Sequence, residues 1–226
     1  MITDKTIRHA MNDSFNDDGM FYIEELAIPK RVCLADIVMT SKRDTSGLHG
    51  YEIKSEVDSL KRLPLQIEYY SRVFERCTLI VAENHEEKAR DMIPDWWGII
   101  VVVREGFDSY GEPTDSFTLL DVREASLNPN PRQKYALLQL LWRNELLELI
   151  SSYELDIDRS LKKRGLREQV AKELSSEQLE QQVKQFLLKR DSWKVPGVAN
   201  PYYEKRKRER AERARKRRER KKKLMT

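Results

Sequence analysis

Charged residues inside apolar, β-prone runs limit the folds open to this chain. Asp36 lies in the run at 32–38, and Glu52 and Lys54 lie in the run at 50–55. Burying an unpaired charge is costly, so such strands either face solvent on one side or hold a cation. Because side chains alternate along a strand, Glu52 and Lys54 project from the same face. We therefore expect a β-sheet that carries a charged site.

The composition argues against a membrane or secreted protein. The chain has 226 residues, of which 35% are charged and 39% hydrophobic, enough for one good core plus an appendage. No apolar run approaches the roughly 18–20 residues that span a bilayer, and the N-terminus lacks a signal-peptide pattern. Cys33 and Cys77 lie among aliphatic residues without C-x-x-C spacing, which predicts two buried thiols. We expect a cytoplasmic protein with no membrane partner.

The net charge of +4 is unevenly distributed. Residues 204–226 contain 14 Lys and Arg against 4 Glu, whereas residues 1–203 have a net charge of −6. Such a basic segment favours contact with a polyanion: DNA, or RNA as the alternative. It would neutralise phosphates without reading bases; the other interpretation is a solvated tail without a partner. The predicted nucleic-acid-binding residues are Lys205, Arg206, Lys207, Arg208, Arg215, Lys216, Arg217, Arg218, Lys221, Lys222 and Lys223.

Hydrophobic periodicity predicts the order of the elements. We expect, in chain order, a helix over 3–15, strands over 21–28, 32–40 and 48–55, a helix within 58–76, a strand over 77–82, a short helix over 85–93, a strand over 99–103 and an edge strand over 117–122. Pro64 is tolerated in a first helical turn, so the regular part of the helix within 58–76 is expected to begin there.

The segment at 128–131 (Asn-Pro-Asn-Pro) marks a boundary, and the chain beyond it has a helical pattern. Helices are expected over 134–151, 160–171 and 176–189, the last capped by Ser175 or Ser176. Residues 155–190 faintly resemble a SAP-like helix-extended-helix module; a helical lid packing on the first domain is the favoured alternative. The predicted division is a first domain at 1–127, a helical region at 132–194 and a basic tail at 204–226.

Asp36, Glu52 and Lys54 together suit metal-dependent hydrolysis of phosphodiesters. A divalent cation activates water and neutralises phosphate charge, and Mg²⁺ or Mn²⁺ takes carboxylate and carbonyl oxygens. Asp36 and Glu52 would be the side-chain ligands, and the carbonyl of Ile53 a third. Lys54 would hold or deprotonate the attacking water, its pKa lowered by burial and the metal. The simpler alternative is a Glu52–Lys54 charge pair on a solvated strand face.

The histidines and tryptophans are expected to pack or to lie at the surface. His9, His49 and His85 are scattered and have no metal-ligand spacing. Trp96 and Trp97 are expected in the core and at its rim, because aromatic residues dominate core burial.

The arrangement of Asp36 and Glu52-Ile53-Lys54 on neighbouring strands resembles that of the PD-(D/E)XK nuclease superfamily. Gln66 and Tyr70, four apart on the next helix, share a face. They resemble a motif of RecB-like members, where it helps to position DNA or the lysine. Further similarity to the MmcB-like branch, and to a related group of uncharacterised bacterial and phage proteins, includes Glu25-Leu26 and Trp97-Gly98.

The resemblance covers about residues 3–103 and implies an α/β (α+β) fold with a restriction-endonuclease-like αβββαβ core. Adjacent strand residues face opposite ways, so only one of Glu24 and Glu25 can face the site. The Glu-Leu pattern of the family implies that Glu25 is this supporting acid. One departure is that the first helix, over 6–15, contains no Glu, where many superfamily nucleases have an extra acid. Either Glu25 replaces that acid, or a second metal is missing.

Two hypotheses of function follow from the resemblance. The first is a metal-dependent deoxyribonuclease, a hydrolase acting in DNA repair or phage DNA processing. The second is a catalytically weak or inactive protein of the nuclease fold that binds nucleic acid or a protein partner.

Overall fold

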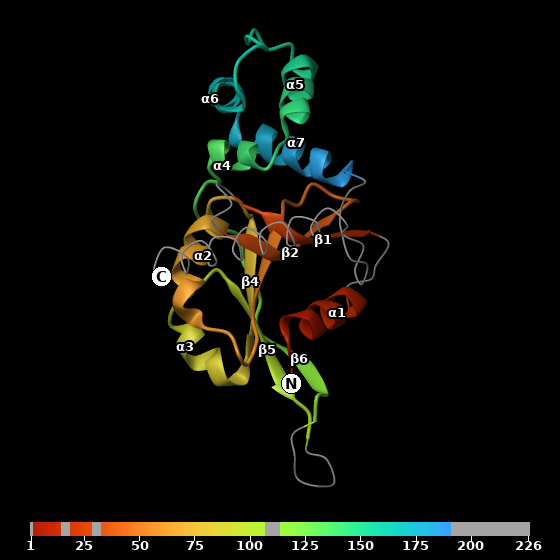
Figure 1. Ribbon diagram of the computed structural model, residues 1–226, viewed down its shortest axis with the longest axis vertical. Helices are drawn as coiled ribbons and strands as arrows, with labels where there is room; N and C mark the ends of the chain where they lie inside the picture. Colours follow the sequence, from red (N-terminus) through yellow and green to blue (C-terminus); the bar gives the residue numbers. More distant parts are fainter. Residues whose placement is uncertain (1, 15–18, 29–32, 107–113, 191–226) are drawn as a thin grey trace, which may run out of the picture. The chain divides into compact units, whose positions relative to one another are not determined.

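The computed structural model describes residues 2–14, 19–28, 33–106 and 114–190, which belong to one compact unit spanning Met1–Arg190. Among these residues the chain forms a mixed six-stranded sheet and seven α-helices, so the expected mixed α+β class is confirmed (Figure 1). Residues 29–31, between the first two predicted strands, and the predicted basic residues between 205 and 223 lie outside the described residues.

The six strands lie in the sheet in the order of the chain, from β1 to β6. Their bounds are β1 Met20–Ala27, β2 Leu34–Ser41, β3 His49–Lys54, β4 Arg76–Ala82, β5 Gly98–Arg104 and β6 Phe117–Arg123. The pairs β3–β4 and β4–β5 are parallel, and the other neighbouring pairs are antiparallel. A parallel pair needs a crossover connection. Helices α2, Leu63–Ser71, and α3, Glu86–Arg90, lie in these two crossovers.

Helix α1, Asp4–Ser14, covers one face of the sheet (Figure 1). Its Ile7 and Met11, four residues apart, pack in a buried cluster with Tyr51 and Ile53 of β3. Glu52 and Lys54 alternate with them along β3 and therefore project from the other face.

Helix α2 packs against this second face. A 3₁₀ turn at Leu60–Arg62 precedes the helix, and Pro64 lies in its first turn as predicted. Tyr70 is fully buried, with its ring centroid 5.5 Å from that of Trp97. Gly50 of β3 lets Phe74 approach the strand closely, because a Cβ atom at position 50 would collide with the Phe74 ring.

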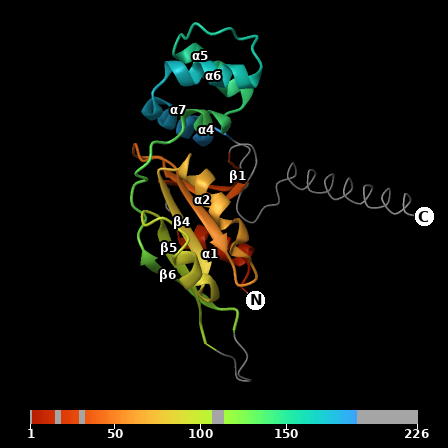
Figure 2. The same cartoon turned by 90° about the vertical axis from the view of Figure 1, so that its left-hand side faces the viewer.

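The helices after the sheet are α4 Lys134–Gln139, α5 Arg143–Ser152, α6 Lys163–Glu173 and α7 Ser176–Leu188 (Figure 2). The single helix predicted over 134–151 is wrong, because the chain breaks between Gln139 and Arg143. The Trp142 N–H donates to Oε2 of Glu145 at 2.6 Å, which starts a new helix. The cap predicted for the last helix is confirmed at Ser175, whose side chain accepts from the Gln178 N–H.

Helix α7 is hydrogen-bonded to the turn between β2 and β3. The Lys184 ammonium, which is almost fully buried, donates to the carbonyls of Asp44 at 2.8 Å and Ser46 at 2.7 Å. The Gln181 amide donates to the carbonyl of Thr45, also at 2.8 Å. The helical region thus holds three consecutive residues of the turn that leads into β3.

Cys33 and Cys77 are free and buried, as predicted. None of the described helices has the length and apolar character needed to cross a bilayer.

Candidate active site

The two candidate acids lie where β2 and β3 separate. The ladder between these strands ends at the pair Ile37 and Tyr51. One step further, the same register places Asp36 opposite Glu52. The carboxylate of Asp36 instead takes the main-chain N–H of Ile53, with 2.8 Å between N and Oδ2. The end of this ladder therefore brings together two acids from neighbouring strands.

The environment of Asp36 opposes its ionisation. Burial and the neighbouring charge of Glu52 raise the pKa of Asp36 to about 8, while Arg8 and the Ile53 N–H act in the opposite direction. Mutual repulsion between carboxylates is relieved when a cation binds between them. In the chain itself, Arg8 and Lys54 supply positive charge beside the two carboxylates.

Glu52 is held by three donors from two elements. Its side chain is 1% exposed. Oε1 accepts from the ammonium of Lys54 and from the amide of Gln66, and Oε2 accepts from the Tyr70 hydroxyl at 2.7 Å. Gln66 and Tyr70, predicted to share a helix face, thus both contact Glu52 and fix the orientation of its carboxylate.

Tyr70 also connects the two acids. Its hydroxyl oxygen accepts from the main-chain N–H of Asp36 at 3.3 Å. Burial and the charges of Glu52 and Asp36 raise the pKa of Tyr70 well above its ordinary value. The hydroxyl therefore keeps its proton and acts as a donor to Glu52 throughout the physiological pH range.

The Glu52–Lys54 pair does not lie on a solvated strand face. The side chain of Lys54 is 9% exposed, and its ammonium forms an ion pair with Glu52. A buried pair of this kind is only weak evidence for stability, because the desolvation of two charges offsets much of their attraction. Because both side chains are buried, the simpler interpretation of a charge pair on a solvated strand face does not describe Glu52 and Lys54.

Glu25 lies across the strand ladder from Asp36, in a strained backbone conformation. The register of β1 and β2 pairs the residues on either side of these two positions, which places Glu25 opposite Asp36. Its φ of 55° is in the left-handed region, which costs about 1–3 kcal/mol for a residue other than glycine and clusters at functional sites. The charge of Glu25 acts on Arg8, whereas that of Glu24 acts on Tyr22.

Sequence reasoning missed a contribution from helix α1. Arg8, at 9% exposure, donates to Oδ1 of Asp36 at 2.8 Å and to the Asp36 carbonyl at 2.6 Å. It also donates twice to the Asp4 carboxylate, at 2.8 and 2.9 Å. The available signal was an acid and a base four residues apart beside the apolar positions Ile7 and Met11. Such a pair is common on exposed helices and does not identify its distant partner.

The oxygen donors present fit a hard divalent cation. In a strand the carbonyl of a residue points to the same side as its N–H, so the Ile53 carbonyl faces the gap beside Asp36. Oε1 of Gln66 is buried and has no hydrogen-bond partner among the described residues. Across the described part of the chain, no three His, Cys, Asp or Glu side chains are placed to hold a metal. A cation here would thus rest on Asp36, Glu52, backbone or amide oxygen and water, a set that suits Mg²⁺.

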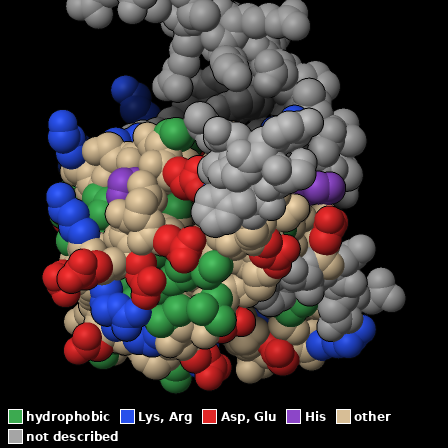
Figure 3. Space-filling model, turned by 90° about the horizontal axis from the view of Figure 1, so that it is seen from below, with side chains coloured by type: hydrophobic (Ala, Val, Ile, Leu, Met, Phe, Trp, Pro, Cys, Tyr) green, Lys and Arg blue, Asp and Glu red, His purple; other side chains and the backbone are tan. Residues whose placement is uncertain are grey.

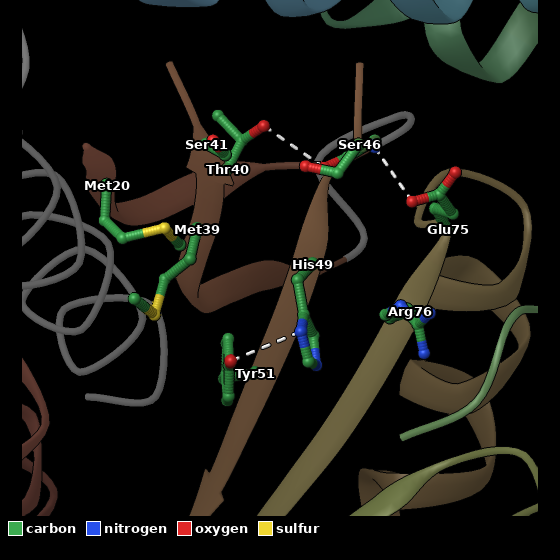
Figure 4. A pocket seen from close by; sticks show the side chains of 10 residues that line it. Met20, Met39, Thr40, Ser41, Ser46, His49, Tyr51, Glu75 and Arg76 are labelled. Atoms are coloured by element: carbon green, nitrogen blue, oxygen red, sulfur yellow. Dashed lines mark hydrogen bonds between the residues drawn. The ribbon is translucent and has the colours of Figure 1, made fainter. Parts of the chain in front are cut away.

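A separate cavity lies at the other end of β3, beside His49 (Figure 4). The His49 ring stacks on Tyr51, and its nitrogens are 2.8 Å from Oγ1 of Thr78 and 3.2 Å from the Tyr51 hydroxyl. Burial and the charge of Arg76 lower the pKa of His49 to about 3. His49 is therefore a neutral packing residue, the role predicted for it.

Charged side chains of both signs cover the face of the molecule in Figure 3, with Asp and Glu spread across it. A surface of this kind does not concentrate positive charge for a polyanion. Contact with nucleic acid through residues 204–226 stays a prediction.

The geometry above belongs to a chain that is similar to one known family. A family model described as bacteriophage P4 protein cII matches residues 5–195. The matched range includes the sheet, the candidate site and all of α4 to α7. No curated protein and no solved structure matched the sequence.

Proposed function

We propose, from the premise that this chain belongs to the bacteriophage P4 protein cII family, that it is a PD-(D/E)XK-type nuclease which hydrolyses the phosphodiester bonds of DNA with a divalent cation. A phage family favours the processing of phage DNA over general DNA repair. Mg²⁺ is the proposed cation, with Mn²⁺ as a substitute.

One observation carries the proposal: Asp36 and Glu52 occupy opposing positions at the point where β2 and β3 separate, and Lys54 lies two residues after Glu52 on the same face. Burying acids is costly unless positive charge compensates them. Buried, perturbed acids are also common at functional sites. The α2 residues Gln66 and Tyr70 hold Glu52 in place. This constraint supports a role that needs a fixed carboxylate.

The proposed division of labour follows from the contacts. Asp36, Glu52 and the Ile53 carbonyl would hold the cation, which when bound supplies Lewis acidity and neutralises phosphate charge. Lys54 would position the attacking water or take its proton. Arg8 and Tyr70 keep the two carboxylates in a fixed relation through their contacts with Asp36 and Glu52.

A second candidate is a nuclease-fold protein that binds nucleic acid and cleaves it weakly or not at all. The observation that favours it is the pairing of each acid with a cation of the chain itself, Asp36 with Arg8 and Glu52 with Lys54. An internal cation can stabilise such a site without any metal. Activity measurements separate the two candidates.

The test is cleavage of supercoiled plasmid, linear duplex and single-stranded DNA by the full chain with Mg²⁺ or Mn²⁺. We expect nicking or degradation that EDTA abolishes. Asp36→Asn and Glu52→Gln should each lower the rate by about 10² or more, in the range of one lost catalytic group. Lys54→Met should lose most turnover and still bind Mn²⁺.

Glu68→Gln is the matched control, because Glu68 lies on α2 but forms an ion pair with Arg72 and is 53% exposed. It should cleave like the wild type. Equal cleavage by the wild type, Asp36→Asn and Glu52→Gln would refute the proposed site. A wild-type chain that binds DNA and leaves every substrate intact would favour the second candidate.

A further inference from the structure

Arg62 begins the face of α2 that contacts the candidate site. It is the residue directly before the helix, and its backbone is already helical, with φ −91° and ψ −12°. Residues four apart share a helix face, so Arg62 continues the row formed by Gln66 and Tyr70. Those two side chains donate to the carboxylate of Glu52. Arg62 is therefore the first member of a row whose next two members hold a candidate acid.

Exposure to solvent increases along this row toward the start of the helix. Tyr70 is fully buried and Gln66 is 5% exposed, whereas Arg62 is exposed. The row thus leads from the buried carboxylate of Glu52 to the surface of the molecule. A ligand that approaches the site along this face meets Arg62 before it meets the buried residues.

The Cys33 thiol relates the charge of Arg62 to the charges of the site. Burial and the charges of Glu52 and Asp36 raise the pKa of this thiol to about 12. The charges of Arg62 and Lys54 act on the same thiol in the opposite direction. Arg62 and the candidate site are thus within electrostatic reach of one buried side chain.

The guanidinium of Arg62 has no ion pair or side-chain hydrogen bond with any residue that the structure describes. By contrast, Arg72, directly after the other end of α2, forms an ion pair with Glu68. A guanidinium presents five N–H donors in a planar fork, which matches the oxygens of a phosphate group. The donors of Arg62 are therefore available to such a ligand.

We propose that Arg62 binds a backbone phosphate of the DNA strand that lies over Asp36 and Glu52. The inference rests on the proposed function and adds a substrate contact to the same site. The two carboxylates repel an approaching strand, and the internal cations Arg8 and Lys54 are already paired with them. Because Arg62 precedes the helix that holds Glu52, a phosphate bound there has a defined position relative to the acids.

The test is the fluorescence anisotropy of a labelled DNA duplex titrated with the full chain at several salt concentrations, in EDTA so that no strand is cut. Arg62→Met should weaken binding by about 3- to 10-fold at low salt, because a charge-assisted contact is lost. It should also reduce the slope of log affinity against log salt by about 0.9, the contribution of one neutralised phosphate. Arg62→Lys keeps the charge but not the planar fork, so it should keep the slope and recover part of the affinity.

Arg159→Met is the matched control, because Arg159 is also exposed and lies in the connection between α5 and α6. It should bind DNA with the affinity and salt slope of the wild type. Circular dichroism verifies that each variant is folded. Arg62→Gln supplies the same comparison if the methionine variant does not fold.

Equal affinity and salt slope in the wild type and a folded Arg62→Met chain would overturn the inference and leave the proposed function intact. An equal loss in Arg159→Met would overturn it as well, because any exposed arginine would then have the same effect. A chain that binds DNA through Arg62 but cleaves none with Mg²⁺ or Mn²⁺ would refute the nuclease function and support this contact. A wild type that binds no DNA would refute both.

Discussion

The hydrogen-bond donors to Glu52 come from two elements. Lys54 lies on the same strand, whereas Gln66 and Tyr70 lie on α2, which follows that strand in the sequence. A truncation at position 52 would leave a buried ammonium without its counter-charge, which typically costs about 3–5 kcal/mol. A glutamine keeps the shape and an acceptor, so it is the more informative substitution for separating chemistry from stability.

His49 predicts a dependence of stability on pH. Its pKa is about 3 in the folded chain and about 6.5 when unfolded. Between these values the unfolded state binds more protons, so the free energy of unfolding falls as pH falls from 6.5 toward 3. We expect a loss of about 1–2 kcal/mol from this residue between pH 7 and pH 5.

Urea unfolding at pH 7 and pH 5 measures this effect. His49→Gln should reduce the difference between the two pH values, and His9→Gln, whose side chain is 73% exposed, should leave it unchanged. Equal pH dependence in the wild type and His49→Gln would show that His49 is not the titrating group.

The sequence identified some site residues and missed others for physical reasons. Asp36, Glu52 and Lys54 are conspicuous because a charge in an apolar run needs an explanation. Arg8 is not, because arginine is ordinary on a helix and its partner lies 28 residues away. The left-handed backbone of Glu25 is likewise invisible, since glutamate has no preference for that conformation.

Among the elements, α7 stabilises the turn before β3 through hydrogen bonds. Lys184→Met should leave the carbonyls of Asp44 and Ser46 without their buried donor. Asp44 and Ser46 are exposed residues, so water can reach their carbonyls. Hydrogen bonds to a charged group contribute about 1.5–3 kcal/mol, and we expect a loss of about that size in the free energy of unfolding. Chemical denaturation followed by circular dichroism measures it.

Lys189→Met is the control for this prediction. It follows α7 directly, but its side chain is 68% exposed and faces Glu148 at 3.7 Å. Its effect should stay within about 0.5 kcal/mol, as for most surface substitutions. A comparable loss in both variants would mean that burial of Lys184 is not what stabilises the turn.

Strand positions were predictable because β-prone runs are bounded by turns, and the start of α7 was predictable from its serine cap. The break between α4 and α5 was not. Leu140 and Leu141 are buried and continue the apolar pattern through it. The new helix begins where Glu145 accepts a hydrogen bond from the Trp142 N–H. This local hydrogen bond competes with continuation of α4 and does not change the hydrophobic periodicity of the sequence.

For the whole molecule, the uneven charge yields a prediction about residues 204–226. Deleting them should weaken DNA binding and flatten its dependence on salt, because fewer counterions are released when fewer phosphates are neutralised. Cleavage at saturating DNA should persist, since the candidate site lies within residues 4–70. Titration of labelled duplex at two salt concentrations, with full-length and truncated chains, measures both quantities.

An unchanged affinity and salt slope after truncation would assign nucleic-acid contact to the remainder of the chain. A truncated chain that no longer cleaves saturating DNA would mean that the segment also takes part in the reaction.

The contact between α7 and the turn at 44–46 could not be predicted at this scale. Residues 138 and 140 positions apart meet there, and neither hydrophobic periodicity nor charge pattern relates segments that distant. The order of elements was readable from the chain, but the placement of the last helices depends on contacts between distant segments, such as those of Gln181 and Lys184.

The order of the strands has a consequence for synthesis of the protein. Each strand joins the edge that the previous one leaves, so the sheet can grow as the chain emerges from the ribosome. Every residue of the candidate site precedes Ser71, which ends α2. Pairing between segments far apart in the sequence slows folding. Asp36 and Glu52 lie on consecutive strands, so bringing them together needs no such distant pairing. We expect the end of the sheet that carries the candidate site to form before the last helices have been translated.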